Sequence, residues 1–195
     1  MKRHLSLLMI LCWGILLHAQ TESELSSPNG EIKVTLNITD KIYYSIAYDG
    51  DVLLKDNSLQ LALKDEVLGQ NPRLRRRKYV SVDEQLTPVM PLKFSTVQLT
   101  LTFKNYSVEF RAYDDGVAYR FVTSRKGEVE VLGEEFAVNF PDDYLLHLQQ
   151  PGGFKTSYEE PYTHVSSNEW KPSDKMSVLP VLIDTRKQYK ILISE

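Results

Sequence analysis

The amino-acid sequence predicts an all-β protein, built as a β-sandwich or a β-barrel. Short runs of alternating apolar and polar residues recur along the chain between turn residues, and beyond the N-terminus no stretch has helical spacing. The clearest run spans residues 106–122, where Asp115-Gly116 separates two arms rich in aromatic and β-branched side chains. Asp-Gly between such arms is typical of a tight hairpin, because the turn requires a positive φ that glycine adopts without strain.

The two arms of this hairpin also predict which face is buried. The face expected to point into the core carries Val108, Phe110 and Ala112. On the opposite face, Arg111 and Arg120 fall near each other across the strands. Two like charges there cost free energy unless a carboxylate such as Glu109 or Asp114 screens them.

The N-terminus has the pattern of a secretory signal peptide over residues 1–19. Lys2 and Arg3 precede an apolar run at residues 5–17, and Ala19 supplies a small residue at the expected cleavage position. The apolar run is shorter than the roughly 20 residues that a membrane-spanning helix needs. We therefore expect an exported protein, periplasmic or secreted, whose mature part, residues 20–195, is one domain with no membrane segment.

Composition narrows the possible partners of the mature chain. Cleavage removes the only cysteine, Cys12, so the domain has to fold without disulfides. It also removes two positive charges and lowers the formal net charge from −3 to −5, which argues against nucleic acid as a partner. The basic run at residues 73–78 interleaves only Leu74 with its charges, and we interpret it as a solvated loop or an edge strand.

The remaining elements follow from alternation and turn residues. Strands are predicted at residues 32–38, 42–48, 52–54, 58–63, 97–103, 128–132, 136–140, 178–183 and 189–193. Residues 80–90 have a loop-like composition. Residues 149–175 show no period of either kind and are rich in Pro, Gly, Ser, Tyr and Glu, which predicts a long loop. Long aromatic loops in compact domains are usually functional.

Few residues of the mature chain suit catalysis. It has two histidines, His147 and His164, and none of the usual phosphate-loop, serine-nucleophile or zinc-helix patterns. His147 lies among leucines, and we expect a hydrogen-bonded structural residue rather than a ligand. Loop carboxylates such as Glu159 and Glu160 are suitable for Ca²⁺, which accepts single carboxylates from scattered loops, although most such glutamates are only solvated.

A family resemblance sharpens these expectations. Residues 110–121 read Phe-Arg-Ala-Tyr-Asp-Asp-Gly-Val-Ala-Tyr-Arg-Phe, which closely resembles a segment of the N-terminal domain of glycoside hydrolase family 97, a group of bacterial α-glycosidases. Further matches follow in the same order, at residues 27–30, 83–89, 159–163 and 193–195. The resemblance implies a large antiparallel β-sandwich of the galactose-mutarotase-like kind, a supersandwich that is incomplete at its C-terminal end. In the family, a (β/α)₈ barrel with the catalytic carboxylates follows.

The resemblance also implies site residues. It assigns Glu159 as one Ca²⁺ ligand, with Glu160 as the alternative one residue on, and it places Tyr162 at the substrate. No catalytic acid, base or nucleophile is expected in this chain, so it supplies a scaffold and one ligand to a barrel that acts on an oligosaccharide, either an α-glucoside or an α-galactoside. A chain without that barrel is expected to expose apolar surface and to be poorly soluble.

One other function fits the residues. A non-catalytic carbohydrate-binding or adhesion module would use aromatic side chains to stack on sugar rings, and Tyr158, Tyr162 and Trp170 are the candidates.

Overall fold

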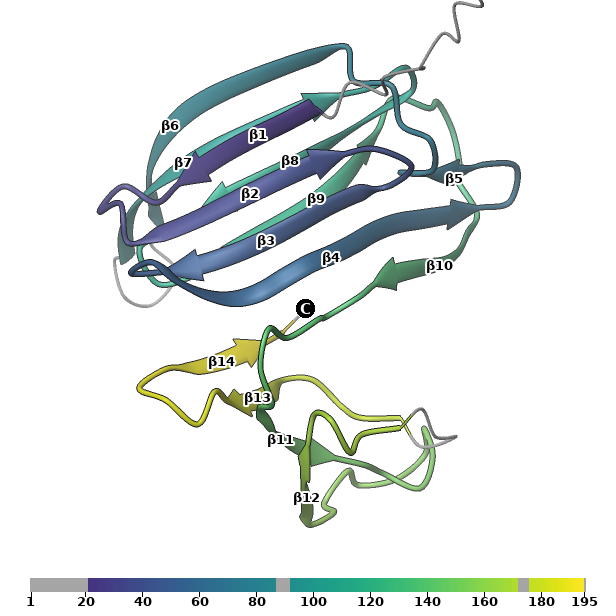
Figure 1. Ribbon diagram of the computed structural model, residues 1–195. Coiled ribbons are helices and arrows are strands. Elements are labelled where there is room, and N and C mark those ends of the chain that lie inside the picture. The colour runs from purple at the N-terminus through teal and green to yellow at the C-terminus, as the bar shows by residue number, and fades with distance from the viewer. Residues whose placement is uncertain (1–20, 87–91, 172–175, 195) are drawn as a thin grey trace, which may run out of the picture.

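The computed structural model describes residues 21–86, 92–171 and 176–194, which form three antiparallel sheets (Figure 1). No helix occurs in these residues, which confirms the all-β fold class. The first sheet has the order β1-β2-β3-β4-β10, with β5 paired to β4; the second is β6-β7-β8-β9, and the third is β12-β11-β13-β14. The predicted signal peptide lies outside the described residues.

The strand bounds are as follows: β1 (Thr21–Ser26), β2 (Ile32–Ile38), β3 (Ile42–Tyr48), β4 (Asp51–Leu63), β5 (Val67–Leu68), β6 (Arg76–Leu86), β7 (Leu92–Thr102), β8 (Tyr106–Ala112), β9 (Val117–Thr123), β10 (Val131–Phe136), β11 (Leu145–Gln149), β12 (Tyr162–Ser166), β13 (Val181–Asp184) and β14 (Lys190–Ile193).

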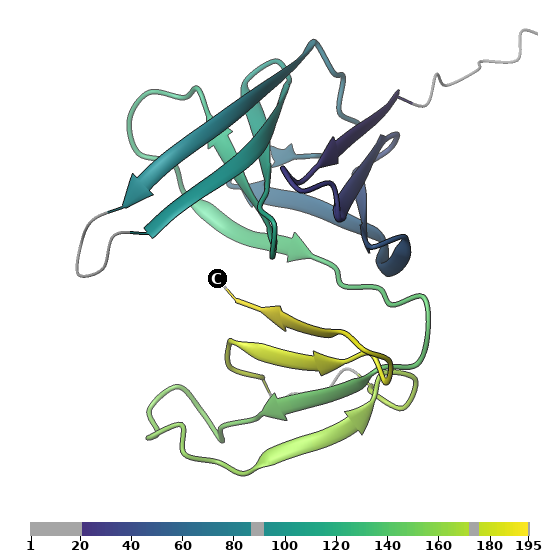
Figure 2. The same ribbon diagram turned by 90° about the vertical axis from the view of Figure 1, so that its left-hand side faces the viewer.

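The first and second sheets pack face to face as a β-sandwich (Figures 1 and 2). Its core is formed by the inward residues of alternating strands, namely Leu25, Ile32, Val34, Leu36, Ile38, Ile42, Tyr44, Leu59, Leu99, Leu101, Phe103, Val108, Phe110 and Ala112. The ring of Tyr44 lies 5.8 Å from that of Phe110, so aromatic contacts bridge the two sheets. Burying side chains of this size stabilises the fold by about 1.5–3 kcal/mol each, which explains how the domain is held together without disulfides.

The predicted hairpin is present as β8 and β9. Tyr113 donates its backbone N–H to the carbonyl of Gly116 at 2.8 Å, and the face predicted to be buried is buried. Glu109 lies directly opposite Arg120, and its Oε2 is 2.7 Å from Nη2 of the guanidinium. This ion pair is the predicted screening of the arginine charge. Arg111 is held separately, by the side-chain oxygen of Gln98 at 2.7 Å.

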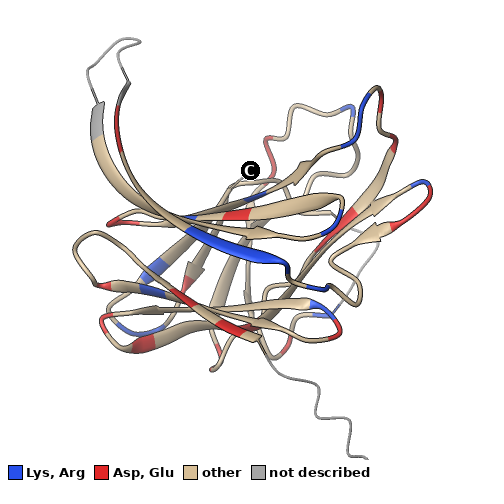
Figure 3. Cartoon of the chain, turned by 90° about the horizontal axis from the view of Figure 1, so that it is seen from above, with Lys and Arg blue, Asp and Glu red and all other residues tan. Residues whose placement is uncertain are grey.

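The basic run begins the edge strand β6, as one of the two interpretations predicted. Residues 75–78 are exposed, and Figure 3 shows them as the longest continuous basic stretch. The loop prediction for residues 80–86 was wrong, because β6 continues to Leu86 and pairs with β7 in unbroken register. An edge strand is paired on one side only and tolerates polar residues such as Asp83. These polar residues obscured the apolar–polar alternation that would have predicted a strand. Residues 87–90 of that prediction lie outside the described residues.

Two other predicted pairs of strands differ from the structure. The strands expected at residues 52–54 and 58–63 are one strand, β4, in which Asp56 has a φ of +51°. β10 (Val131–Phe136) runs through the expected turn at Gly133 and overlaps only the ends of the strands expected at 128–132 and 136–140; its pairing with β4 is irregular between Val131 and Gly133. β1, β11 and β12 were not predicted. β12 falls inside the segment expected to be a loop.

The third sheet has its own small core, formed by Tyr144, Leu146, Leu148 and Ile183. Figure 1 shows this sheet below the sandwich, reached through the segment that follows β10. Asn139, in the segment between the sandwich and the third sheet, is bonded to the sandwich. Its N–H donates to Asn57 Oδ1 at 2.5 Å, and its side chain donates to the Asp56 carbonyl at 3.0 Å. The face of the third sheet opposite this core, its outer face, leaves Leu192 63 % exposed.

No helix in the described residues is long and apolar enough to cross a membrane.

Candidate functional site

Glu159 and Glu160 lie on one loop, residues 150–161, which connects β11 to β12 at the end of the third sheet, and Tyr162 is the first residue after it (Figures 1 and 2). The two strands pair antiparallel from Leu145 opposite Ser166 to Gln149 opposite Tyr162. Gln149 also donates its side-chain amide to the carbonyl of Glu160 at 3.1 Å, and this bond closes the base of the loop. The two ends of the loop are therefore fixed by the sheet.

Side-chain hydrogen bonds organise the loop itself. Tyr158 donates its hydroxyl to the carbonyl of Phe154 at 2.8 Å, and its N–H donates to Thr156 Oγ1 at 3.3 Å. Tyr158 has a φ of +58°, in the left-handed region that non-glycine residues rarely adopt. Such strain persists only where surrounding contacts impose it, and it is common at functional sites. The backbone at Glu159 directly follows this bend.

Glu159 and Glu160 are both exposed, and Tyr162 is 55 % exposed at the first position of β12. Among the described residues, no cluster of three or more His, Cys, Asp or Glu side chains is arranged to hold a metal ion. Carboxylates of this loop alone therefore do not complete a metal site, and a Ca²⁺ bound by Glu159 would need further oxygen ligands, since the ion takes six to eight.

The loop also presents a group of aromatic side chains. Phe154 is 82 % exposed, and Tyr158 and Tyr162 accompany it. Trp170, the third aromatic proposed for sugar stacking, is half-buried and packs against the core of the third sheet, so its ring is less available. Phe154 was not among the predicted site residues, although its position after Gly152-Gly153 in a loop was an available signal.

Asp143 anchors the other end of β12. Its carboxylate accepts hydrogen bonds from the hydroxyl of Ser166 and from the N–H of Asn168 at 3.1 Å, and Arg186 lies 3.0 Å away. The hydrogen bonds from Ser166 and Asn168 are the main reasons that the pKa of Asp143 is lowered, with a smaller contribution from the charge of Arg186. A charged Asp143 thus holds the turn after β12 against the hairpin of β13 and β14.

The two histidines are brought together by the pairing of β11 with β12. His147 Nδ1 lies 2.7 Å from His164 Nδ1, which confirms that His147 is hydrogen-bonded. The partner was not foreseen, because β12 was not predicted and the pairing depends on its register.

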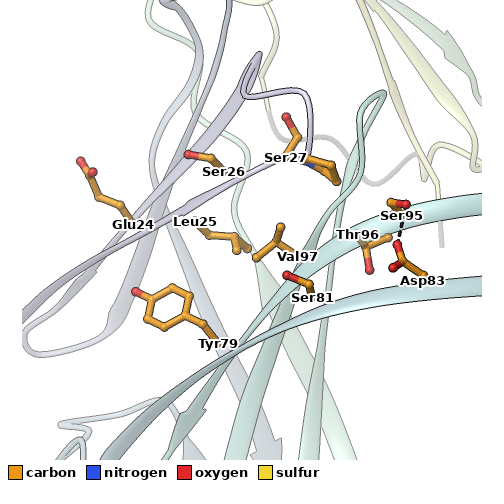
Figure 4. Close-up of a pocket in the computed structure, with 11 residues that line it drawn as sticks. Glu24, Leu25, Ser26, Ser27, Tyr79, Ser81, Asp83, Ser95, Thr96 and Val97 are labelled. Atoms are coloured by element: carbon orange, nitrogen blue, oxygen red, sulfur yellow. Dashed lines mark hydrogen bonds between the residues drawn. The ribbon is translucent and has the colours of Figure 1, made fainter.

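A separate hollow of about 500 Å³ lies on the sandwich, between β1 and the strands β6 and β7 (Figure 4). Leu25 and Val97 line its centre, and Tyr79 lies at one end. At the other end Ser95 donates its hydroxyl to Asp83 at 2.6 Å. The hollow contains neither Glu159 nor Tyr162.

Comparison with known proteins identifies relatives among glycosidases. The chain is 30 % identical over 210 residues to a retaining alpha-galactosidase from Bacteroides thetaiotaomicron; the alignment covers 100 % of this chain and 32 % of that protein. The chain thus spans about a third of the length of this curated relative.

Two solved structures share the fold. A beta-arabinopyranosidase superposes with a TM-score of 0.71 at 21 % identity, over 84 % of this chain and 30 % of the other. A glycoside hydrolase family 97 enzyme from Pseudoalteromonas sp. strain K8, solved with panose, superposes with a TM-score of 0.69 at 21 % identity, over 84 % of this chain and 27 % of the other. Residues 25–195 match the family described as Glycosyl-hydrolase 97 N-terminal, and the chain therefore belongs to that family.

Proposed function

We propose that this chain is the N-terminal β-sandwich portion of an exported α-glycosidase that hydrolyses α-galactosidic or α-glucosidic bonds in oligosaccharides. In this proposal the chain supplies a scaffold and one Ca²⁺ ligand, Glu159, to an active site in a (β/α)₈ barrel. Membership of the family and the glycosidase relative support the enzyme class. The observation that carries the site is the exposed Glu159 on a loop whose two ends are fixed.

The position of Glu159 suits a ligand shared between domains. Its carboxylate is exposed, while the strained bend at Tyr158 and the bond between Gln149 and Glu160 restrict the backbone on both sides. Restricting a ligand in advance reduces the entropy lost on binding. When bound, the Ca²⁺ would polarise or orient the sugar and the carboxylates around it. Tyr162, three residues on, would contact the sugar with its exposed ring.

The test uses the full-length enzyme with the substitution Glu159→Gln. The amide keeps the shape of the side chain and removes the charge that attracts the cation. We expect the Ca²⁺ concentration needed for half-maximal activity to rise, and kcat/KM to fall by about 10–100-fold at limiting Ca²⁺. Initial rates on p-nitrophenyl α-galactoside and α-glucoside over a Ca²⁺ series measure both quantities and identify the preferred sugar.

Glu160→Gln is the matched control, because Glu160 is the exposed neighbour on the same loop. Normal Ca²⁺ dependence in that variant and loss in the Glu159 variant support the assignment. The reverse pattern moves the ligand to Glu160, and unchanged kinetics in both variants removes the loop from the metal site. N-terminal sequencing of the mature protein tests export, with Gln20 expected as the first residue.

The exposed aromatic group on the loop favours a second candidate, a non-catalytic carbohydrate-binding or adhesion module. Phe154, Tyr158 and Tyr162 would then stack on sugar rings. The gene sequence beyond codon 195 separates the two functions. A barrel-coding region there supports the enzyme, and a stop codon followed by an unrelated gene supports the module.

A further inference from the structure

The outer face of the third sheet carries a pair of histidines that the proposed glycosidase function does not use. His147 on β11 lies directly opposite His164 on β12 in the antiparallel register. Their ring centroids are 4.8 Å apart, the rings are inclined by 75°, and the two Nδ1 atoms are 2.7 Å apart. They are the only histidines beyond residue 18. Register alone brings them together, from positions 17 residues apart.

A contact between two Nδ1 atoms at this distance requires a shared proton. One ring donates its Nδ1–H, and the other accepts with its Nδ1 lone pair. When the proton of the donor ring lies on Nε2 instead, both rings are still neutral and both Nδ1 atoms present a lone pair at one point on the surface. A neutral imidazole nitrogen is the most common protein ligand for transition metals. The two nitrogens that make this hydrogen bond are therefore also suited to bind one metal ion together.

The spacing fits such an ion closely. Two nitrogens each about 2.0–2.1 Å from one metal lie about 2.9 Å apart at a right angle and about 3.3 Å apart at a tetrahedral angle. The Nδ1 atoms thus need to separate by only a few tenths of an ångström from their 2.7 Å contact. His164 is exposed and His147 half-buried, so solvent reaches the pair. To bind one ion, each ring has to turn so that its Nδ1 lone pair points at the ion rather than at the other ring.

We propose that His147 and His164 form a two-nitrogen site for a transition-metal dication of the Zn²⁺, Ni²⁺ or Cu²⁺ class. Imidazole is the ligand type these ions share, whereas Ca²⁺ selects oxygen. No third His, Cys, Asp or Glu joins the pair in the part of the chain that the structure describes. Asp184, on the same face of β13, is engaged by Lys190 at 2.7 Å. Water completes the coordination, and the ion exchanges readily.

Such an ion would fasten the base of the loop that carries Glu159. His147 lies two residues before Gln149, the last residue of β11, and His164 lies two residues after Tyr162, the first residue of β12. The site therefore bridges the two strands immediately below the loop. Because the protons and the metal compete for the same nitrogens, binding weakens as the pH falls.

Calorimetric titration of the untagged full chain with NiCl₂ tests the site. We expect one equivalent of Ni²⁺ to bind, and either His147→Asn or His164→Asn to weaken binding by more than about 10-fold, the cost of losing even an outer-shell partner. The double variant His4→Asn/His18→Asn is the control and should bind as the parent does if any N-terminal segment is retained. CaCl₂ should not compete.

A second readout follows the loop directly. Ni²⁺ should slow tryptic cleavage after Lys155, an exposed loop residue, in the parent chain and not in the two variants. Melting curves without metal verify that the variants are folded. Equal Ni²⁺ binding by the parent and both variants, or no binding by the parent, overturns the proposal. The Ca²⁺ dependence assigned to Glu159 should persist in His147→Asn, so the two proposals fail independently.

Discussion

Lys41 and Glu135 are joined across 94 positions of sequence: Lys41 Nζ donates to both carboxylate oxygens of Glu135, at 2.7 and 2.9 Å. Lys41 is in the turn between β2 and β3, and Glu135 is in β10. Ser58 adds a hydrogen bond to the same carboxylate at 2.5 Å. These contacts, Lys41 first, hold the pKa of Glu135 below its usual value of 4.5. They fix β10 as the last strand of the first sheet.

This contact predicts how stability depends on pH. A carboxylate whose pKa is lowered in the folded state stabilises the fold above its unfolded pKa, and this contribution is lost as the pH falls through the folded value. Glu135→Gln should therefore lower Tm at pH 7 and make the fall in Tm below about pH 4.5 less steep. Melting curves by circular dichroism between pH 3 and pH 7 measure both effects. Glu128→Gln, at an exposed loop position, is the control and should reproduce the parent curve.

Gly69 is predicted to be intolerant of a side chain. Its φ is +88°, and a Cβ there would lie 2.6 Å from the backbone carbonyl of Leu59. Its N–H also donates to the hydroxyl of Tyr106 at 3.0 Å. Gly69→Ala should destabilise the fold by about 1–3 kcal/mol in urea unfolding. Gly133→Ala is the comparison, because a Cβ there meets no atom within 4 Å; equal losses in the two variants would contradict the explanation.

Asp143→Asn is predicted to loosen the third sheet alone. The amide keeps the shape of the side chain, but its NH₂ group replaces the charged oxygen that Arg186 contacts. The remaining oxygen is an uncharged and therefore weaker acceptor for Ser166 and Asn168. Hydrogen exchange should accelerate at backbone amides of β11 and β12 and stay unchanged in the sandwich. Asp142→Asn, the exposed neighbour, should have a smaller effect. Uniform acceleration in both parts would show that the sheets unfold together.

The fold class and the central hairpin were predictable because their signals are local. Asp115-Gly116 and the alternation around it specify the turn and the buried face within a few residues. β1 and β12 lack such signals. β1 reads Thr-Glu-Ser-Glu-Leu-Ser, with Leu25 as its only large apolar residue, and Ser23 fills a buried position that alternation would assign to an apolar side chain. β12 is specified by pairing with β11, which no local pattern reveals.

The candidate site likewise has a part that the sequence could predict and a part that it could not. The loop with Glu159 and Tyr162 stood out through its composition and the family resemblance. The contact between His147 and His164 depends on the register of two strands, and a shift of one residue would place the two rings on opposite faces. The sequence could not show it before β12 was known.

The two hydrophobic cores share no residue. Mutations that reshape the loop above β11 and β12 therefore need not disturb packing between the larger sheets. The loop can therefore vary in sequence and length without repacking the sandwich. For an engineer, residues 150–161 are a segment that can be replaced as a cassette while the larger core stays intact.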